Sequence, residues 1–189
     1  MMKILAVLYD RIIANRLKSW LSFNVDQTAF QKFKSTLIHI FTVRLLIEIA
    51  KKKNVTLFIG SMDIEKAFDT VPRLPLLQKL VKIGIGRCML AALKQLYSYT
   101  TCIIKFKQAF SNSFRMLRGI RQGAASSVLL FNEFMDGLFK HLADLCDDED
   151  ILGDIHTLIH ADDTIILSTN RTAFIQKCNE TVKFTIHSP

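Results

Sequence analysis

The 189-residue chain has few cysteines, no long apolar run and no internal repeat. Its four cysteines are scattered, without the Cys-x-x-Cys pair of many metal and redox sites. This usage predicts reduced, structural cysteines in an intracellular protein of the nucleus or cytoplasm. No uncharged apolar stretch approaches the roughly 18–20 residues of a membrane span. The opening segment also lacks the small-residue cleavage site of a signal peptide, so we predict neither a transmembrane segment nor a secretory leader.

Half of the residues are hydrophobic, which excludes a disordered chain and suffices for the core of one domain or of part of a larger one. The net charge of +8 is unevenly distributed. Residues 1–60 and 61–120 each carry ten Lys or Arg against three acids, whereas residues 121–189 carry five against eleven. This division suggests a polyanion partner beside a cation site, although charge alone fits a solvated basic surface equally well.

Hydrophobic periodicity predicts helices interleaved with a few strands. Helices are expected at 2–23, from Ser35-Thr36 to Lys51–Lys53, from Pro72 to Gly84, at 86–98, at about 127–146 with Ser126 or Ser127 as cap, and from about 171. Strands are expected at 55–63, in TTCIIKF and SNSFRML with a turn near Gln108, and in a hairpin at 155–168. This order predicts an α+β fold, an antiparallel sheet backed by helices on one face.

The hairpin at 155–168 is the most informative stretch. Its apolar runs flank Asp162 and Asp163, which places both carboxylates at the tip. Adjacent acids repel one another unless a cation lies between them. Mg²⁺ is suitable because it takes oxygen ligands, often one or two carboxylates together with substrate phosphates. An isolated Asp-Asp pair is more often an ordinary turn, so the argument depends on the rest of the chain.

Two further stretches carry candidate chemistry. In MDIEKAFDTV, Asp63 ends an apolar strand, where an inward carboxylate would be costly without a cation. Residues 118–136 run from a Gly/Ala/Ser-rich segment into an amphipathic helix, and small residues let a ligand approach the backbone. One acid on a strand and two on a neighbouring hairpin can hold two metal ions for phosphoryl or nucleotidyl transfer. Sequence spacing does not decide whether the fold brings them together.

The segments MDIEKAFD, GIRQGAASSVLLFN and HADD resemble, in order and spacing, the three palm motifs of reverse transcriptases. The resemblance is greatest to the enzymes of non-LTR (LINE-type) retrotransposons. RIIANRLKSWL and QTAFQKFKSTLIHIFTVRLLIE are similar to the fingers segments of that family. The resemblance implies a right-hand polymerase fold in which residues 1–189 form a single reverse transcriptase domain fragment. Partial helical fingers would occupy about 1–54 and the palm about 55–189, with thumb and endonuclease absent.

The same resemblance implies an RNA-directed DNA polymerase. It would transfer nucleotides from dNTPs to the primer 3′-OH with two Mg²⁺ ions, or Mn²⁺, and its partners would be an RNA template and a DNA primer or target. Asp63 and Asp162 would ligate the metals and Asp163 would complete the catalytic triad. Phe68 falls where the family has a steric gate that favours deoxynucleotides. The other nucleotide-binding candidates are Gln122, Gly123, Lys32 and Lys34.

Several of these residues also have a plainer interpretation. Phe68 could simply be a core residue, and Asp69 is better explained as a helix N-cap or a structural acid than as a metal ligand. His160 stands where the family has an aromatic residue and is expected to pack or to hydrogen-bond. The lysines at 51–53 suit a helix C-terminus.

The chain departs from the family in ways that weaken its grip on substrate. Phe33 replaces a glycine of the fingers loop, and Gln31 and Lys34 stand in place of arginines, whose planar bidentate contacts lysine cannot make. Ala125 and Val128 replace prolines of the second motif. The chain also stops before the motif that supplies a lysine general acid in the family. Nucleotidyl transfer depends on positioning, so we expect this truncated domain to be poorly productive alone.

Two other functions remain open. A catalytically inert remnant could bind nucleic acid through its basic face, and the substitution Asp162→Asn would then change little. Another metal-dependent nucleotidyl- or phosphotransferase could share a palm-like core, and a preference for dNTP or NTP would decide. A structural protein would require three motifs to coincide by chance.

Overall fold

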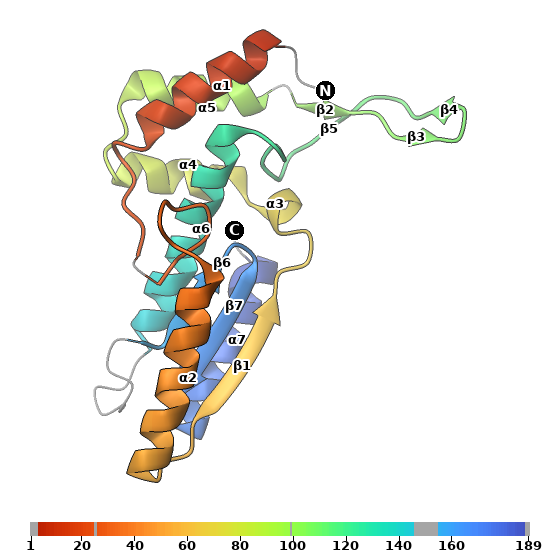
Figure 1. Ribbon diagram of the computed structural model, residues 1–189. Coiled ribbons are helices and arrows are strands. Elements are labelled where there is room, and N and C mark those ends of the chain that lie inside the picture. The colour runs from red at the N-terminus through yellow and green to blue at the C-terminus, as the bar shows by residue number, and fades with distance from the viewer. Residues whose placement is uncertain (1–3, 25, 99, 146–154, 188–189) are drawn as a thin grey trace. The chain divides into compact units, whose positions relative to one another are not determined.

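The computed structural model describes residues 4–24, 26–98, 100–145 and 155–187 (Figure 1). The chain forms two compact units. One comprises residues 1–22 and 68–130, and the other comprises residues 23–67 and 131–188. Within the described ranges, no helix is long and apolar enough to cross a membrane. Cys88, Cys102 and Cys178 are free thiols, and Cys146 lies outside the described residues.

The second unit is built on an antiparallel sheet with the strand order β1-β7-β6. The strands are β1 (Phe58–Asp63), β6 (Thr157–His160) and β7 (Asp163–Ser168). These strands confirm both the strand expected at 55–63 and the hairpin expected at 155–168. A short segment extends the sheet at its β6 edge, because the N–H of Thr28 donates to the carbonyl of Ile159 at 3.0 Å and the N–H of Ile159 donates to that of Asp26 at 3.1 Å.

Polar side chains of helix α6 (Ala125–Ala143) hydrogen-bond to this edge segment. The buried Asn132 side chain donates to the carbonyl of Ala29 at 2.8 Å and accepts from Gln27 Nε2 at 3.3 Å. One turn further along, Asp136 accepts from the N–H of Asn24 at 3.1 Å. Polar side chains on an otherwise apolar helix therefore fix the chain that enters the sheet.

One face of the sheet is covered by helix α7 (Arg171–His187) (Figure 1). The Phe58 ring stacks on that of Phe174, with 5.8 Å between the ring centroids. Gly60, two residues along β1, points to the same face. A Cβ atom there would lie 2.9 Å from the Phe174 ring, so the absence of a side chain lets the helix approach closely.

The opposite face is covered by helix α2 (Thr36–Lys53). Leu46 packs there in one buried cluster with Leu158 and Leu167. The sheet thus carries a helix on each face, and the expectation of helices on one face was wrong. The physical reason is that β6 and β7 are apolar at consecutive positions, so both of their faces need cover.

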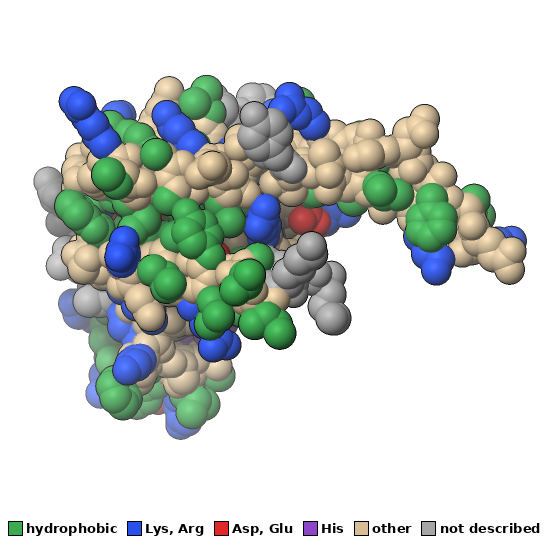
Figure 2. All heavy atoms as spheres, turned by 90° about the horizontal axis from the view of Figure 1, so that it is seen from above, with side chains coloured by type: hydrophobic (Ala, Val, Ile, Leu, Met, Phe, Trp, Pro, Cys, Tyr) green, Lys and Arg blue, Asp and Glu red, His purple; other side chains and the backbone are tan. Residues whose placement is uncertain are grey.

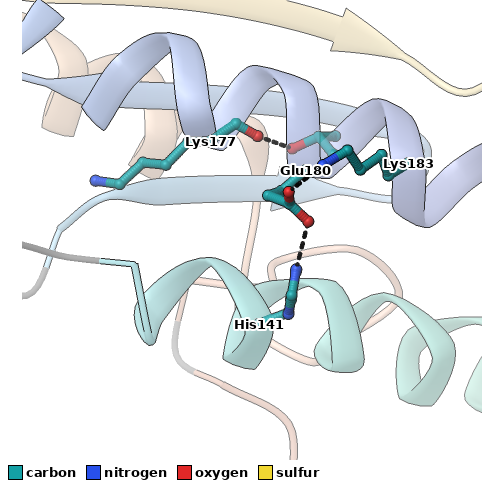
Figure 3. A network of polar contacts seen from close by, with 5 residues as sticks. His141, Lys177, Glu180 and Lys183 are labelled. Carbon is teal, nitrogen blue, oxygen red and sulfur yellow. Dashed lines mark hydrogen bonds and ion pairs between the residues drawn. The ribbon is translucent and has the colours of Figure 1, made fainter. Parts of the chain in front are cut away.

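Helices α6 and α7 pack against each other through aromatic and polar contacts. Phe134 and Phe184 lie with their ring centroids 5.0 Å apart. Nearby, Glu180 accepts from Lys183 Nζ at 2.7 Å and lies 3.1 Å from His141 Nε2 (Figure 3). Both hydrogen bonds lower the pKa of the Glu180 carboxyl, and the one from Lys183 has the larger effect. The apolar stripe expected on α6 is confirmed, with these of its residues buried: Phe131, Met135, Leu138 and Leu142.

The first unit contains helices and a long hairpin. Its helices are α1 (Ile4–Leu17), α4 (Arg73–Lys82) and α5 (Arg87–Ser98), and the short α3 (Ala67–Thr70) leads into it. The hairpin pairs β2 (Thr101–Cys102) with β5 (Phe114–Arg115), and β3 (Lys105–Phe106) with β4 (Ala109–Phe110). The expected helices and the turn near Gln108 are confirmed, although the helix expected at 2–23 ends at Leu17, and α3 was not foreseen.

The N-terminus of α6 differs from the sequence-based expectation. Ser126 and Ser127 lie inside the helix, which begins at Ala125, so neither is its cap. The buried Asp10 carboxylate of α1 instead accepts from the N–H of Ala125 at 2.6 Å, from the N–H of Ser126 at 3.2 Å and from the Ser126 hydroxyl. An acid distant in sequence thus satisfies the free N–H groups and the positive end of the helix dipole.

Candidate active site

Asp63 and Asp163 lie at the same end of the sheet. Asp63 is the last residue of β1, Asp163 is the first of β7, and the two are directly opposite in the antiparallel register. Side chains of such a pair share a face of the sheet, with Cβ atoms about 4.5–5.5 Å apart. Both residues are exposed. The fold therefore brings together two carboxylates that lie 100 positions apart in the sequence, and solvent reaches both.

Asp162 lies beside this pair, in the two-residue turn that joins His160 to Asp163. Its partner in the turn, Ala161, has a φ of 57°, in the left-handed region that two-residue hairpin turns use at their first position. That conformation is unfavourable for alanine. The turn thus holds Asp162 next to the Asp63–Asp163 pair at some cost in backbone energy.

Among the residues that the structure describes, no group of three His, Cys, Asp or Glu side chains converges as a preformed metal cage. The donor set nevertheless fits Mg²⁺, which retains water ligands and is commonly held by one or two carboxylates with substrate phosphates. Opposed carboxylates supply the hard oxygen donors that this ion prefers, and a cation would relieve their mutual repulsion.

A cleft of about 530 Å³ lies between α2 and the face of the sheet that carries Asp163. His160 and His39 line it, with His160 Nδ1 2.9 Å from Thr28 Oγ1 and His39 Nε2 3.0 Å from the carbonyl oxygen of Asp26. The two imidazoles meet edge to face at 6.4 Å between ring centroids. His160 is thus a packing and hydrogen-bonding residue, as expected, and His39 is a neighbour that the sequence did not reveal.

Burial lowers the pKa of His39, and the nearby His160 and Lys34 lower it further, against the opposing effect of its hydrogen bond to the Asp26 carbonyl. The imidazole therefore favours its neutral form more than a solvated histidine does. His160 is the residue that enters the Asp162 turn, so this pair of imidazoles lies next to the candidate metal ligands.

The two lysines expected to contact phosphate lie in a loop before α2. Lys32 is exposed and Lys34 is half-buried. Phe33 between them is fully exposed and has a φ of 62°. That conformation suits glycine, which is the residue the family pattern has at this position. The loop thus keeps a glycine-like backbone with a phenylalanine in it.

Phe68 belongs to the other compact unit and lies on α3, half-buried. The segment around it runs beside the start of the second motif. The carbonyl of Phe68 accepts from the N–H of Ile120 at 2.8 Å, and that of Val71 accepts from the N–H of Gly119 at 2.9 Å. Gly119 has a φ of 82°, and a Cβ atom there would lie 2.8 Å from the Asp69 carbonyl oxygen. Only glycine at position 119 allows these two chain segments to lie this close.

Gln122 is joined to the same segment. Its Nε2 donates to Asp69 Oδ1 at 3.2 Å, and Gly123 follows with a φ of 81°. Asp69 lies inside α3, so it is a structural acid and not an N-cap. The fold therefore brings Gln122 to Asp69, the residue after Phe68, although 53 positions separate them in sequence.

Arg73 completes this arrangement and was missed by sequence reasoning. Its guanidinium donates to the carbonyls of Gly119 at 2.6 Å, Met116 at 2.6 Å and Tyr97 at 3.0 Å. The ring of Tyr97 also lies beneath it, 5.2 Å from the guanidinium carbon. An arginine that follows a proline at a helix start carries no local signal of such a role.

The family profile for "Reverse transcriptase (RNA-dependent DNA polymerase)" matches residues 2–188. The chain belongs to this family. Relatives of this reverse transcriptase chain include the Pol polyprotein of the type-1 retrotransposable element R2 of Popillia japonica, with 26% identity over 166 residues. That match covers 86% of the chain and 23% of the relative. The transposon TX1 149 kDa protein of Xenopus laevis is 28% identical over 180 residues, covering 90% of the chain and 14% of that protein.

The fold agrees with the family. Apo telomerase from Candida tropicalis, truncated from its C-terminal domain, superposes with a TM-score of 0.55 at 14% identity, over 94% of this chain and 36% of that one. The antiparallel sheet with its helices is thus a partial polymerase palm, as the sequence predicted. The reverse transcriptase chain spans less than a quarter of the length of the retrotransposon relatives named above.

Proposed function

We propose that this chain carries the catalytic centre of an RNA-directed DNA polymerase of a mobile element, which extends a primer 3′-OH with dNTPs on an RNA template. The observation that carries the proposal is the direct opposition of Asp63 and Asp163, with Asp162 in the adjoining turn, in a chain of the reverse transcriptase family. In this arrangement three acidic residues from two chain segments lie at one end of a sheet.

In this function Asp63 and Asp162 would hold two Mg²⁺ ions, and Asp163 would complete the set near the primer end. Bound Mg²⁺ would supply electrostatic stabilisation of the attacking and leaving oxygens during nucleotidyl transfer. The protein's own contribution is to hold the carboxylates on a rigid sheet, since strand pairing fixes Asp63 and Asp163. A site placed on strands is held more firmly than one placed on loops.

The proposed nucleotide-binding residues are Phe68, Gln122, Gly123, Lys32 and Lys34. The Phe68 ring would exclude a ribose 2′-hydroxyl, and the hydrogen bond of Gln122 to Asp69 supports a fixed loop beside it. Gly123 would let a base or sugar approach the backbone. Lys32 and Lys34 would meet the triphosphate as point charges. Residues from about 55 to 189 would form the palm and those before them part of the fingers.

The proposal is tested by Mg²⁺-dependent primer extension on an RNA template, with dNTPs and NTPs compared. Asp162→Asn should abolish extension, while Asp144→Asn, which removes an exposed carboxylate at the end of α6, should leave it unchanged. Nucleic acid binding without extension by the wild-type chain would favour an inert remnant. Equal use of NTPs would indicate another nucleotidyltransferase.

A further inference from the structure

Residues 100–116 form one continuous hairpin, named here the aromatic hairpin. Its two short strand pairs, β2–β5 and β3–β4, are joined through Ile104 and Ser111, where the N–H of Ser111 donates to the Ile104 carbonyl and the Ser111 hydroxyl accepts from the Ile104 N–H, both at 2.9 Å. At the tip, Lys107 takes a φ of 54°. At the base, beyond the β2–β5 pair, the N–H of Met116 donates to the carbonyl of Thr100 at 2.9 Å.

The aromatic hairpin is exposed along its whole outer length. Every residue from 103 to 115 is exposed, including Phe106 at 71% and Phe110 at 67%. Large apolar side chains that are exposed together mark an interaction surface. An isolated two-stranded hairpin is also only marginally stable in water. Figure 2 shows hydrophobic and basic side chains next to each other on this hairpin, at the right of the view.

Each face of the aromatic hairpin carries a ring paired with a lysine. Lys105 lies opposite Phe110, with its Nζ 5.5 Å from the ring centroid. Lys107 Nζ lies 5.6 Å from the ring of Phe106, which is opposite Ala109. Because successive residues of a strand point to opposite faces, the Phe106 and Phe110 rings lie on different sides of the ribbon. Both sides therefore present an aromatic surface with a cation beside it.

The charged residues of the chain segment that contains the hairpin all have one sign. Between residues 70 and 132 the chain has ten Lys or Arg and no Asp or Glu. A partner for such a segment is polyanionic by charge complementarity. Exposed rings interleaved with lysines are the combination that binds single-stranded nucleic acid, in which unpaired bases stack on aromatic side chains and phosphates meet the cations.

The base of the aromatic hairpin is fixed to its own unit. Arg73 of α4 donates to the carbonyl of Met116, on the outgoing arm, and to that of Tyr97, just before the incoming arm. Arg73 therefore links the two arms of the hairpin at its base. These contacts fix the base of the hairpin from which the two rings project.

We propose that the aromatic hairpin binds single-stranded nucleic acid, with bases stacked on Phe106 and Phe110 and phosphates contacted by Lys105 and Lys107. The assignment of the strand as template or primer rests on the proposed polymerase function, whereas the binding itself does not. The hairpin surface includes none of the residues of the carboxylate centre.

The test is fluorescence anisotropy of the full chain with short labelled single-stranded RNA, single-stranded DNA and duplex DNA. The double variant Phe106→Ala/Phe110→Ala should bind single strands about tenfold or more weakly, with a smaller effect on duplex DNA. The matched control is Phe41→Ala, because Phe41 is a similarly exposed ring, at 68%, on α2. Circular dichroism melting verifies that each variant is folded.

A second pair of substitutions tests the phosphate contacts. Lys105→Gln/Lys107→Gln should reduce the slope of log affinity against log salt by about two, with Lys52→Gln on α2 as control. A 4-thiouridine oligonucleotide should crosslink within residues 100–116. Single-strand affinity of the aromatic variant within twofold of wild type would overturn the proposal. The proposal would also be overturned if the aromatic variant bound nucleic acid like the wild type but lost a dimer that the wild-type chain forms, because the hairpin would then be a protein interface. If binding depends on the hairpin but the chain extends no primer, the proposed polymerase function is contradicted and the binding proposal stands.

Discussion

Asp63 and Asp163 face each other across the β1–β7 ladder, each at the end of its strand. Like charges placed directly opposite in an antiparallel pair are destabilising. The sheet tolerates this arrangement at an exposed end, where water screens the two carboxylates. This opposition is the feature expected of residues that act on a cation.

The first prediction concerns this pair and Mg²⁺. Without divalent ions, Asp163→Asn should raise the free energy of unfolding by roughly 0.2–1 kcal/mol, since it removes the repulsion. Mg²⁺ should raise the melting temperature of the wild-type chain and not that of the variant, because a ligand that binds only the folded state stabilises it. Thermal melts with and without Mg²⁺ measure both effects. Glu48→Gln, at an exposed position on α2, is the control, and an equal Mg²⁺ shift in all three proteins would contradict the prediction.

The second prediction concerns Asp69 as the partner of Gln122. Asp69→Ala removes the acceptor of a 3.2 Å hydrogen bond. An exposed bond of this kind contributes about 0.5–1.5 kcal/mol, so dNTP binding should weaken by roughly threefold to tenfold. Asp69→Asn keeps an acceptor oxygen and should restore the affinity. Titration calorimetry with dNTP measures it, and an asparagine variant as weak as the alanine variant would show that the bond does not position Gln122.

The third prediction compares two glycines of positive φ. Gly119→Ala should lower the free energy of unfolding by about 3 kcal/mol, because the new Cβ would meet the Asp69 carbonyl oxygen at 2.8 Å. Gly84 has a φ of 91° and open space around it, so Gly84→Ala should cost only the backbone strain, about 1 kcal/mol. Urea unfolding of the two variants measures the difference. Equal losses would mean that the close approach of the two segments adds nothing.

The fourth prediction concerns pH. The pKa of His39 is lowered in the folded chain by burial and by the neighbouring His160 and Lys34. The unfolded chain therefore binds this proton more readily. The stability contributed by neutral His39 is fully present above its ordinary pKa of 6.5 and is lost as the pH falls from there through the folded value. Urea unfolding from pH 8 to about pH 5 should show the decline, and His39→Gln, which can still donate to the Asp26 carbonyl, should flatten it. An unchanged profile in His39→Gln would assign the decline to other groups.

The sequence by itself determined the elements and the family. Period-3.6 and period-2 patterns located six of the helices and the central hairpin, because local patterning selects backbone dihedrals and the face that is buried. The acids of the first and third motifs could also be found in sequence, since a carboxylate at the end of an apolar strand or between two such strands costs free energy unless a cation or hydrogen bonds compensate it. Strand ends and tight turns are local features, so the positions of Asp63 and Asp162 followed without a structure.

The tertiary structure alone decided which residues meet. The Asp63–Asp163 register, the Asp10 carboxylate at the start of α6, and the Arg73 contacts each join segments far apart in sequence. The same holds for the helix on each face of the sheet, since an apolar run does not show whether one face or both are covered. Such contacts depend on which surfaces fit and bury together, a property of the whole packed unit that no short stretch of the chain encodes.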